Sequence, residues 1–164
     1  MNTKYKTESE IADVVKGFEH ATISRDDFKH AEHLTVALHY VSIYDLETAT
    51  EKMRSGSCKL LVAVGFDLTK EMPYHETLTV FWMRTIDKFN NSKNGTSLLD
   101  KANGLVGNYD KDYPLKFYSR EFLFRTKREQ DLLKATFSEF RAIRGYVVPR
   151  EPRKSTEHNE NRVD

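Results

Sequence analysis

The sequence is poor in the features that mark several common classes of protein. Its 164 residues include one cysteine, Cys58, so no disulfide can form within the chain. Basic and acidic residues nearly balance, 26 against 25, whereas a dedicated nucleic-acid binder would carry a strongly basic stripe. No long apolar run and no signal-like N-terminus is present, so we expect a cytoplasmic protein with no membrane and no nucleic acid among its partners.

Strand-like alternation is also scarce, and apolar residues recur instead at spacings of three and four. This pattern predicts an all-α fold, a single-domain helical bundle of about six helices over residues 1–148. Residues 149–164 are charged and nearly free of apolar side chains, which predicts a disordered tail containing His158. Cys58 has no acid, base or ligand at a spacing that would mark a nucleophile or a metal site.

Local signals give the expected bounds of these helices. Ser24 with Asp27 resembles a capping box, Gly65 suits the position after a helix, and Pro73 suits the first turn of one. Gly56 is expected to interrupt or bend the helix that contains it. The expected helices span residues 8–18, 25–41, 44–64, 73–89, 96–106 and 126–140.

One expected helix carries a histidine and a glutamate in its first turn. At about 100° per residue, His75 leads an apolar stripe that should face the core and contains Leu78, Thr79, Trp82, Ile86 and Phe89. Glu76 falls on the flank of this stripe. A buried histidine needs a partner inside the protein, so the sequence must supply one elsewhere.

The segment 27–40 supplies the other dense histidine cluster. His30 and His33 lie about one turn apart, on the same side of the expected helix as Leu34 and Ala37. The residues after Leu34 are apolar nearly all round, which is typical of a buried helix. We therefore expect His30 and His33 to point toward one place.

Three histidines from two core helices predict a metal site. Neutral imidazoles suit a divalent transition metal such as Fe, Zn, Mn, Cu or Ni, so we expect His30, His33 and His75 to be ligands. Glu76 is the candidate catalytic residue, as a general base or as a group that orients an imidazole, although it could also be a fourth ligand. Glu32 and His39 point away from His30 on the helix and are not expected to share its metal.

The spacing excludes two known metal architectures. A zincin needs histidines four residues apart with a glutamate between them, and a ferritin-like bundle needs repeated Glu-x-x-His helices. The alternative to a metal is a buried polar network in which the histidines bind Tyr hydroxyls or Glu76. The aromatic residues of segment 109–124 similarly favour core packing over a cofactor site, although the sequence leaves open whether they line the site.

Four short motifs occur in order over residues 28–124: His30-Ala31-Glu32-His33-Leu34, Met53-Arg54-x-Gly56, Tyr74-His75-Glu76-Thr77-x-Thr79, and Phe117-Tyr118-Ser119-Arg120-Glu121-x-Leu123-Phe124. Their combination resembles an uncharacterised family of small, mostly bacterial helical proteins. The resemblance implies that His30, His33, His75 and Glu76 belong to the family's motifs, and it implies no activity. Ser57 departs from the family, in which an apolar residue usually follows the glycine.

Two classes of function follow, with a third in reserve. The first is a metal-dependent enzyme acting on a small organic molecule, either a non-haem iron oxygenase or oxidase or a zinc-type hydrolase. The second is a helical protein that binds a small ligand in a polar, histidine-lined pocket. The third is a structural or interaction module in which the histidines are satisfied core residues. The sequence does not indicate the substrate or the oligomeric state.

Overall fold

The computed structural model describes residues 3–68 and 73–123. The chain divides into two compact units, residues 1–124 and residues 125–164. The second unit lies outside the described residues. The expected helix at 126–140, the tail and the boundary at 148/149 therefore also lie outside them. Within the described part every regular element is helical, which confirms the all-α fold. None of its helices is both long and apolar enough to cross a membrane.

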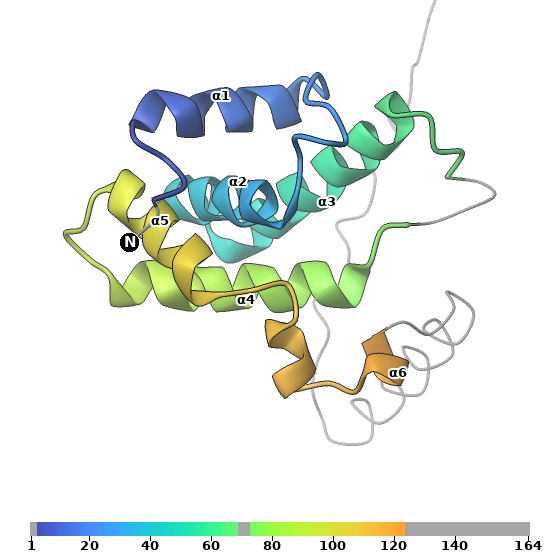
Figure 1. The fold of residues 1–164 in the computed structure, drawn as a ribbon. Helices are drawn as coiled ribbons and strands as arrows, with labels where there is room; N and C mark the ends of the chain where they lie inside the picture. Colours follow the sequence, from blue (N-terminus) through green and yellow to red (C-terminus); the bar gives the residue numbers. More distant parts are fainter. Residues whose placement is uncertain (1–2, 69–72, 124–164) are drawn as a thin grey trace, which may run out of the picture. The chain divides into compact units, whose positions relative to one another are not determined.

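Five helices of eleven or more residues make up this unit (Figure 1). They are α1 (Glu8–Glu19), α2 (His30–Ile43), α3 (Leu46–Ala63), α4 (Glu76–Ser92) and α5 (Leu98–Asn108). A 3-10 turn, η1 (Tyr113–Lys116), and a four-residue helix, α6 (Arg120–Leu123), follow α5. The described part thus has five long helices and two single turns, where the sequence predicted about six helices for residues 1–148.

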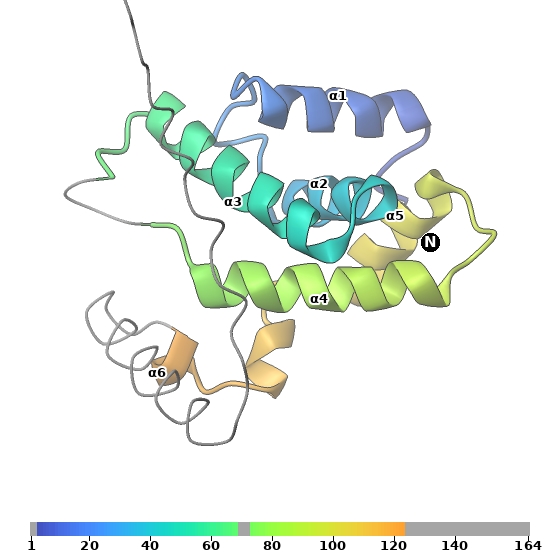
Figure 2. The same cartoon turned by 180° about the vertical axis from the view of Figure 1, so that it is seen from behind.

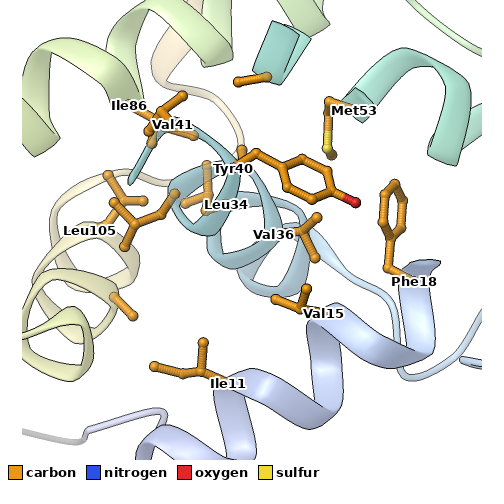
Figure 3. Close-up of a cluster of buried hydrophobic side chains, with 14 of the residues drawn as sticks. Ile11, Val15, Phe18, Leu34, Val36, Tyr40, Val41, Met53, Ile86 and Leu105 are labelled. Carbon is orange, nitrogen blue, oxygen red and sulfur yellow. The ribbon is translucent and has the colours of Figure 1, made fainter. Parts of the chain in front are cut away.

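Helix α2 is the centre of the unit. It contacts α1, α3, α4 and α5, and both views place it inside the other helices (Figures 1 and 2). Its residues from Leu34 to Leu38 are all buried, as its nearly continuous apolar sequence predicted. Figure 3 shows side chains from the surrounding helices converging on it, among them Phe18, Met53, Ile86 and Leu105.

The start of α2 differs from the expected one. The Ser24 and Asp27 side chains do bond, with Ser24 Oγ 2.6 Å from Asp27 Oδ2, but they close only one turn. The helix begins at His30 because the Glu32 carboxylate accepts a hydrogen bond from the Lys29 backbone N–H at 2.9 Å. The expected start at residue 25 was therefore wrong by five positions.

Helix α4 also begins later than expected. His75 is its N-cap residue, with φ −113° and ψ 100°, so Pro73 is not its first residue and His75 precedes the first turn. Glu76 is the first helical residue, where the helix dipole favours a carboxylate. The predicted stripe survives this change because the His75 carbonyl accepts the Thr79 N–H at 3.0 Å and so continues the helical register.

Helix α3 passes through Gly56 without a break, contrary to the expected interruption. A Cβ at this position would lie 2.3 Å from Cε1 of Phe18, a fully buried ring that stacks on Phe28. The glycine therefore permits close packing of α1 on α3. At the end of α3, Gly65 has a φ of 95°, which confirms its expected place after the helix.

Candidate functional site

A cavity of about 510 Å³ lies between α2, α3 and α4. The walls are mainly apolar, and they include Leu34 and Ala37 from α2, Met53 and Leu60 from α3, and Met83 and Ile86 from α4. These helices place apolar residues at spacings of three and four, so each contributes a continuous stripe. The stripe predicted for α4 borders the cavity through Leu78, Thr79, Trp82 and Ile86.

The three predicted metal ligands all line this one cavity. His30 and His33 come from the first turn of α2, and His75 comes from the N-cap of α4. All three histidines therefore border the same cavity, while their role as metal ligands stays a prediction. Within residues 3–68 and 73–123, however, no group of three or more His, Cys, Asp or Glu side chains is arranged to hold a metal ion.

Backbone carbonyls orient two of these histidines. His30 Nε2 lies 3.1 Å from the Tyr109 carbonyl oxygen, and His33 Nδ1 lies 2.8 Å from the Lys29 carbonyl oxygen. A carbonyl can only accept, so each of these ring nitrogens carries the proton. In the neutral ring the other nitrogen, Nδ1 of His30 and Nε2 of His33, then has a lone pair that can accept a hydrogen bond or bind a metal.

Aromatic side chains hold both rings in place. The His33 ring packs on Phe28 with centroids 4.1 Å apart, and the His30 ring packs on Trp82 at 5.1 Å. The surrounding protein desolvates His33 and lowers its pKa, although the residue keeps accessible surface beside the cavity. The neutral form of His33 is therefore favoured.

The predicted catalytic residue, Glu76, is committed to other partners. Arg54 of α3 donates to both of its oxygens, from Nε at 2.9 Å and from Nη2 at 2.5 Å, and the Tyr74 hydroxyl donates at 2.7 Å. Arg54 also pairs with Glu51. Glu76 borders a separate hollow on the α4 surface with Val80 and Arg84.

Tyr74 links the Arg54–Glu76 ion pair to the cavity, because its side chain lines the cavity wall and its hydroxyl also donates to Glu76. Burial is the main reason that the pKa of Tyr74 rises to about 12, so the hydroxyl keeps its proton at neutral pH. Sequence reasoning gave no role to Tyr74 or Arg54, although both stand in the short motifs. Without the fold, nothing in the sequence showed that Arg54 would face Glu76.

Two other residues set aside on sequence grounds are indeed away from this site. Glu32 is buried and accepts from Lys4 Nζ at 2.7 Å, and it lines no part of the cavity. Burial alone would raise the pKa of Glu32, but bonds from Lys4 and from backbone N–H groups lower it overall. His39 packs on Tyr40, with ring centroids 6.0 Å apart.

The aromatic segment after α5 packs beside the site. Tyr109 and Tyr113 meet edge to face at 4.7 Å, and both contact Trp82 at about 6 Å between centroids. None of the described aromatic residues of this segment lines the cavity. Their contribution is indirect, because the Tyr109 carbonyl fixes the ring of His30.

No protein-family model matches this chain, and neither a curated protein nor a solved structure matches it.

Proposed function

We propose that this protein binds a small, largely apolar molecule in the cavity between α2, α3 and α4. The observation that carries the proposal is the cavity itself, with a volume of about 510 Å³ and mainly apolar walls. Binding sites for small molecules typically combine apolar walls with a few placed polar groups. The cavity is partly open to solvent, so a molecule could enter it while its buried apolar wall covers that molecule.

The polar groups on the wall supply orientation. Nδ1 of His30 and Nε2 of His33 are acceptors in the neutral rings, and the Tyr74 side chain, held by Glu76, adds a fixed polar group. A bound molecule that carries a hydroxyl or an N–H could satisfy one of the imidazoles. This supports the histidine-lined binding pocket that the sequence offered as its second class of function.

A metal-dependent enzyme is the second candidate. Its support is that His30, His33 and His75 share one cavity and that two of them donate a ring N–H to a carbonyl, as metal-binding imidazoles commonly do. The ion would be a divalent transition metal such as Fe, Zn, Mn or Cu. Glu76 would act on it through Tyr74, as a positioning residue rather than as a general base.

Trp82 gives a direct test of ligand binding, because it is the only tryptophan of the chain and it lines the cavity. We expect the neutral dye Nile red to quench or shift Trp82 fluorescence and to emit as it does in an apolar environment. Ser57→Phe, which fills the cavity from α3, should abolish both signals. Val62→Phe is the matched control, since Val62 is 58% exposed on the same helix and does not line the cavity.

Nile red binding that Ser57→Phe leaves unchanged would show that the dye sits elsewhere and would contradict the proposal. Element analysis of protein purified without a histidine tag tests the second candidate separately. Stoichiometric metal that is lost in His75→Ala, while Val62→Phe retains it, would favour the metal-dependent enzyme. A chelator should then also lower the melting temperature of wild type and leave that of His75→Ala unchanged.

A further inference from the structure

We propose that the ligand of this cavity is an amphipathic anion, a molecule with an apolar body and a single carboxylate, and that the carboxylate lies at the mouth among Arg25, Lys29 and Lys111. This inference rests on the proposed function and names its ligand class. It comes from the way in which exposure and charge are distributed around the cavity.

The floor of the cavity is buried and apolar. Leu34 is 1% exposed, Met83 is 1% exposed and Ile86 is fully buried. Ala37, Met53 and Leu60 extend the same surface. On α4 the lining runs from His75 to Ile86, a span of about 16 Å at 1.5 Å per residue. An elongated apolar body is therefore the shape that this floor would bury best.

The mouth has the opposite character. Arg25, Lys29 and Lys111 also line the cavity, and all three are exposed residues. They are its only residues with a full formal charge among those the structure describes, and no described Asp or Glu lines it. The chain as a whole is nearly neutral, with 26 basic and 25 acidic residues, so this bias is local.

Two of the cations are placed by contacts that leave them able to bind an anion. The Arg25 guanidinium lies over the Phe66 ring at 5.3 Å, and Phe66 also lines the cavity. Stacking uses the face of a guanidinium and leaves its N–H edge for an oxygen. Lys29 Nζ lies 3.3 Å from Asp26 Oδ1, but both side chains are mostly exposed, and such a pair contributes little.

The helix directions add to the positive potential. Both α2 and α4 begin at the histidine end of the cavity, with His30 as the first residue of one and His75 as the N-cap of the other. A helix N-terminus carries a partial positive charge that favours anions. A cationic ligand would meet repulsion at this mouth, and a neutral one would gain nothing from the three cations.

Three straight-chain probes of equal length separate these cases: decanoate, decanol and decylammonium. With full-length wild type and Trp82 fluorescence as the readout, we expect decanoate to bind about tenfold more tightly than decanol, and decylammonium to bind most weakly. The preference for decanoate should shrink as salt is raised, because an exposed charge pair is screened.

Removing the charges should remove the preference. Arg25→Gln, Lys29→Gln and Lys111→Gln should each lower the affinity for decanoate about two- to fivefold and leave that for decanol unchanged. The matched control is Lys52→Gln, because Lys52 also lies over an aromatic ring, Tyr44 at 4.7 Å, but does not line the cavity. It should leave the binding of both probes unchanged.

The outcomes distinguish this inference from the proposed function. Equal binding of decanoate and decanol, or loss of decanoate binding in the Lys52 variant as well, would overturn the inference and leave the cavity as a neutral binding site. If neither decanoate nor decanol binds while Nile red does, only the inference is overturned. If decanoate, decanol and Nile red all leave Trp82 fluorescence unchanged, the proposed function is overturned too.

Discussion

At the scale of single residues, Gly56 has the closest approach to a neighbouring side chain among the described glycines. Gly56→Ala would place a Cβ 2.3 Å from Cε1 and 2.6 Å from Cζ of Phe18, a fully buried residue of α1 whose ring stacks on Phe28. Overpacking of this kind destabilises by about 1–3 kcal/mol. The better helix propensity of alanine returns only about 0.5–1 kcal/mol, so the net effect should be a loss.

Urea unfolding followed by circular dichroism measures this change as a lower midpoint at unchanged slope. Gly104→Ala is the control, since Gly104 lies within α5 and the nearest atom to its Cβ would be 3.7 Å away. That variant should be as stable as wild type or more stable. If Gly56→Ala behaved in the same way, the ring of Phe18 would not be fixed.

Glu76→Gln tests the residue that the sequence named as catalytic. The variant keeps the side-chain volume but loses the charge that binds Arg54, a pair whose side chains are 27% and 36% exposed. We expect a loss of about 1 kcal/mol in the free energy of unfolding, because partly exposed pairs contribute modestly. Metal content, if any, should not change, since Glu76 does not line the cavity.

Glu51→Gln provides the comparison for this variant, because it removes the more exposed partner of the same arginine. Its effect on stability should be smaller. A loss of bound metal in Glu76→Gln, with Glu51→Gln unaffected, would contradict the assignment of Glu76 to positioning and would indicate the alternative that the sequence left open, a fourth metal ligand.

At the scale of elements, two similar Ser-x-x-Asp pairs have different consequences. Ser97 accepts from the Asp100 N–H at 3.1 Å and begins the eleven-residue α5, whereas Ser24 accepts from the Asp27 N–H at the same distance and closes only a turn. Loss of an N-cap typically costs about 1 kcal/mol. Ser97→Ala should therefore lower the free energy of unfolding by this amount, and Ser24→Ala should lower it less.

If thermal melts showed equal losses of stability in Ser97→Ala and Ser24→Ala, the turn at Ser24 would contribute as much to stability as a helix start.

The Ser24 and Asp27 pair also explains one limit of the sequence analysis. The spacing Ser24-x-x-Asp27 predicted a helix cap, but the two side chains only close a turn, and Lys29 with Glu32 decides where α2 begins. Local patterns that compete within a few residues are resolved by burial, here of Phe28 against Phe18.

The spacing of apolar residues and histidines predicted the site better than the local signals predicted where the helices begin. The stripe from His75 to Ile86 and the pair His30 and His33 depend only on relative spacing, so they survived shifts of three to five residues in the helix starts. The partner of Glu76 could not be predicted, because Arg54 lies 22 positions away on another helix. The basic mouth was missed for the same reason, since Arg25, Lys29 and Lys111 are brought to one cavity only by the fold.

At the scale of the whole molecule, two histidines connect stability to pH. Burial is the main cause that lowers the pKa of His33 and of His39 below the ordinary value of 6.5. The unfolded chain then binds more protons than the folded one as pH falls through this value, so stability present above it is lost on acidification. The melting temperature should fall between about pH 7 and pH 5.

Replacing both residues, as His33→Gln with His39→Gln, should flatten this dependence. His20→Gln is the control, because His20 is exposed at the end of α1 and bonds the Lys16 carbonyl locally. Glu32 does not interfere, since its lowered pKa keeps it ionised over this range. If the melting temperature of the double variant still fell between about pH 7 and pH 5, groups other than His33 and His39 would cause the acid sensitivity.

One pair of hydrogen bonds bears on the order in which this unit is completed. The Tyr5 N–H donates to Asn103 Oδ1 and the Asn103 amide donates to the Tyr5 carbonyl, each at 2.9 Å and across 98 positions of sequence. A ribosome adding about 5–20 residues per second would need roughly 5–20 s to supply the second partner after the first. These two bonds can therefore form only after α5 has been synthesised, whereas Lys4 and Tyr5 can already bond Glu32 and Thr35 of α2, so the N-terminal segment completes its docking in two stages.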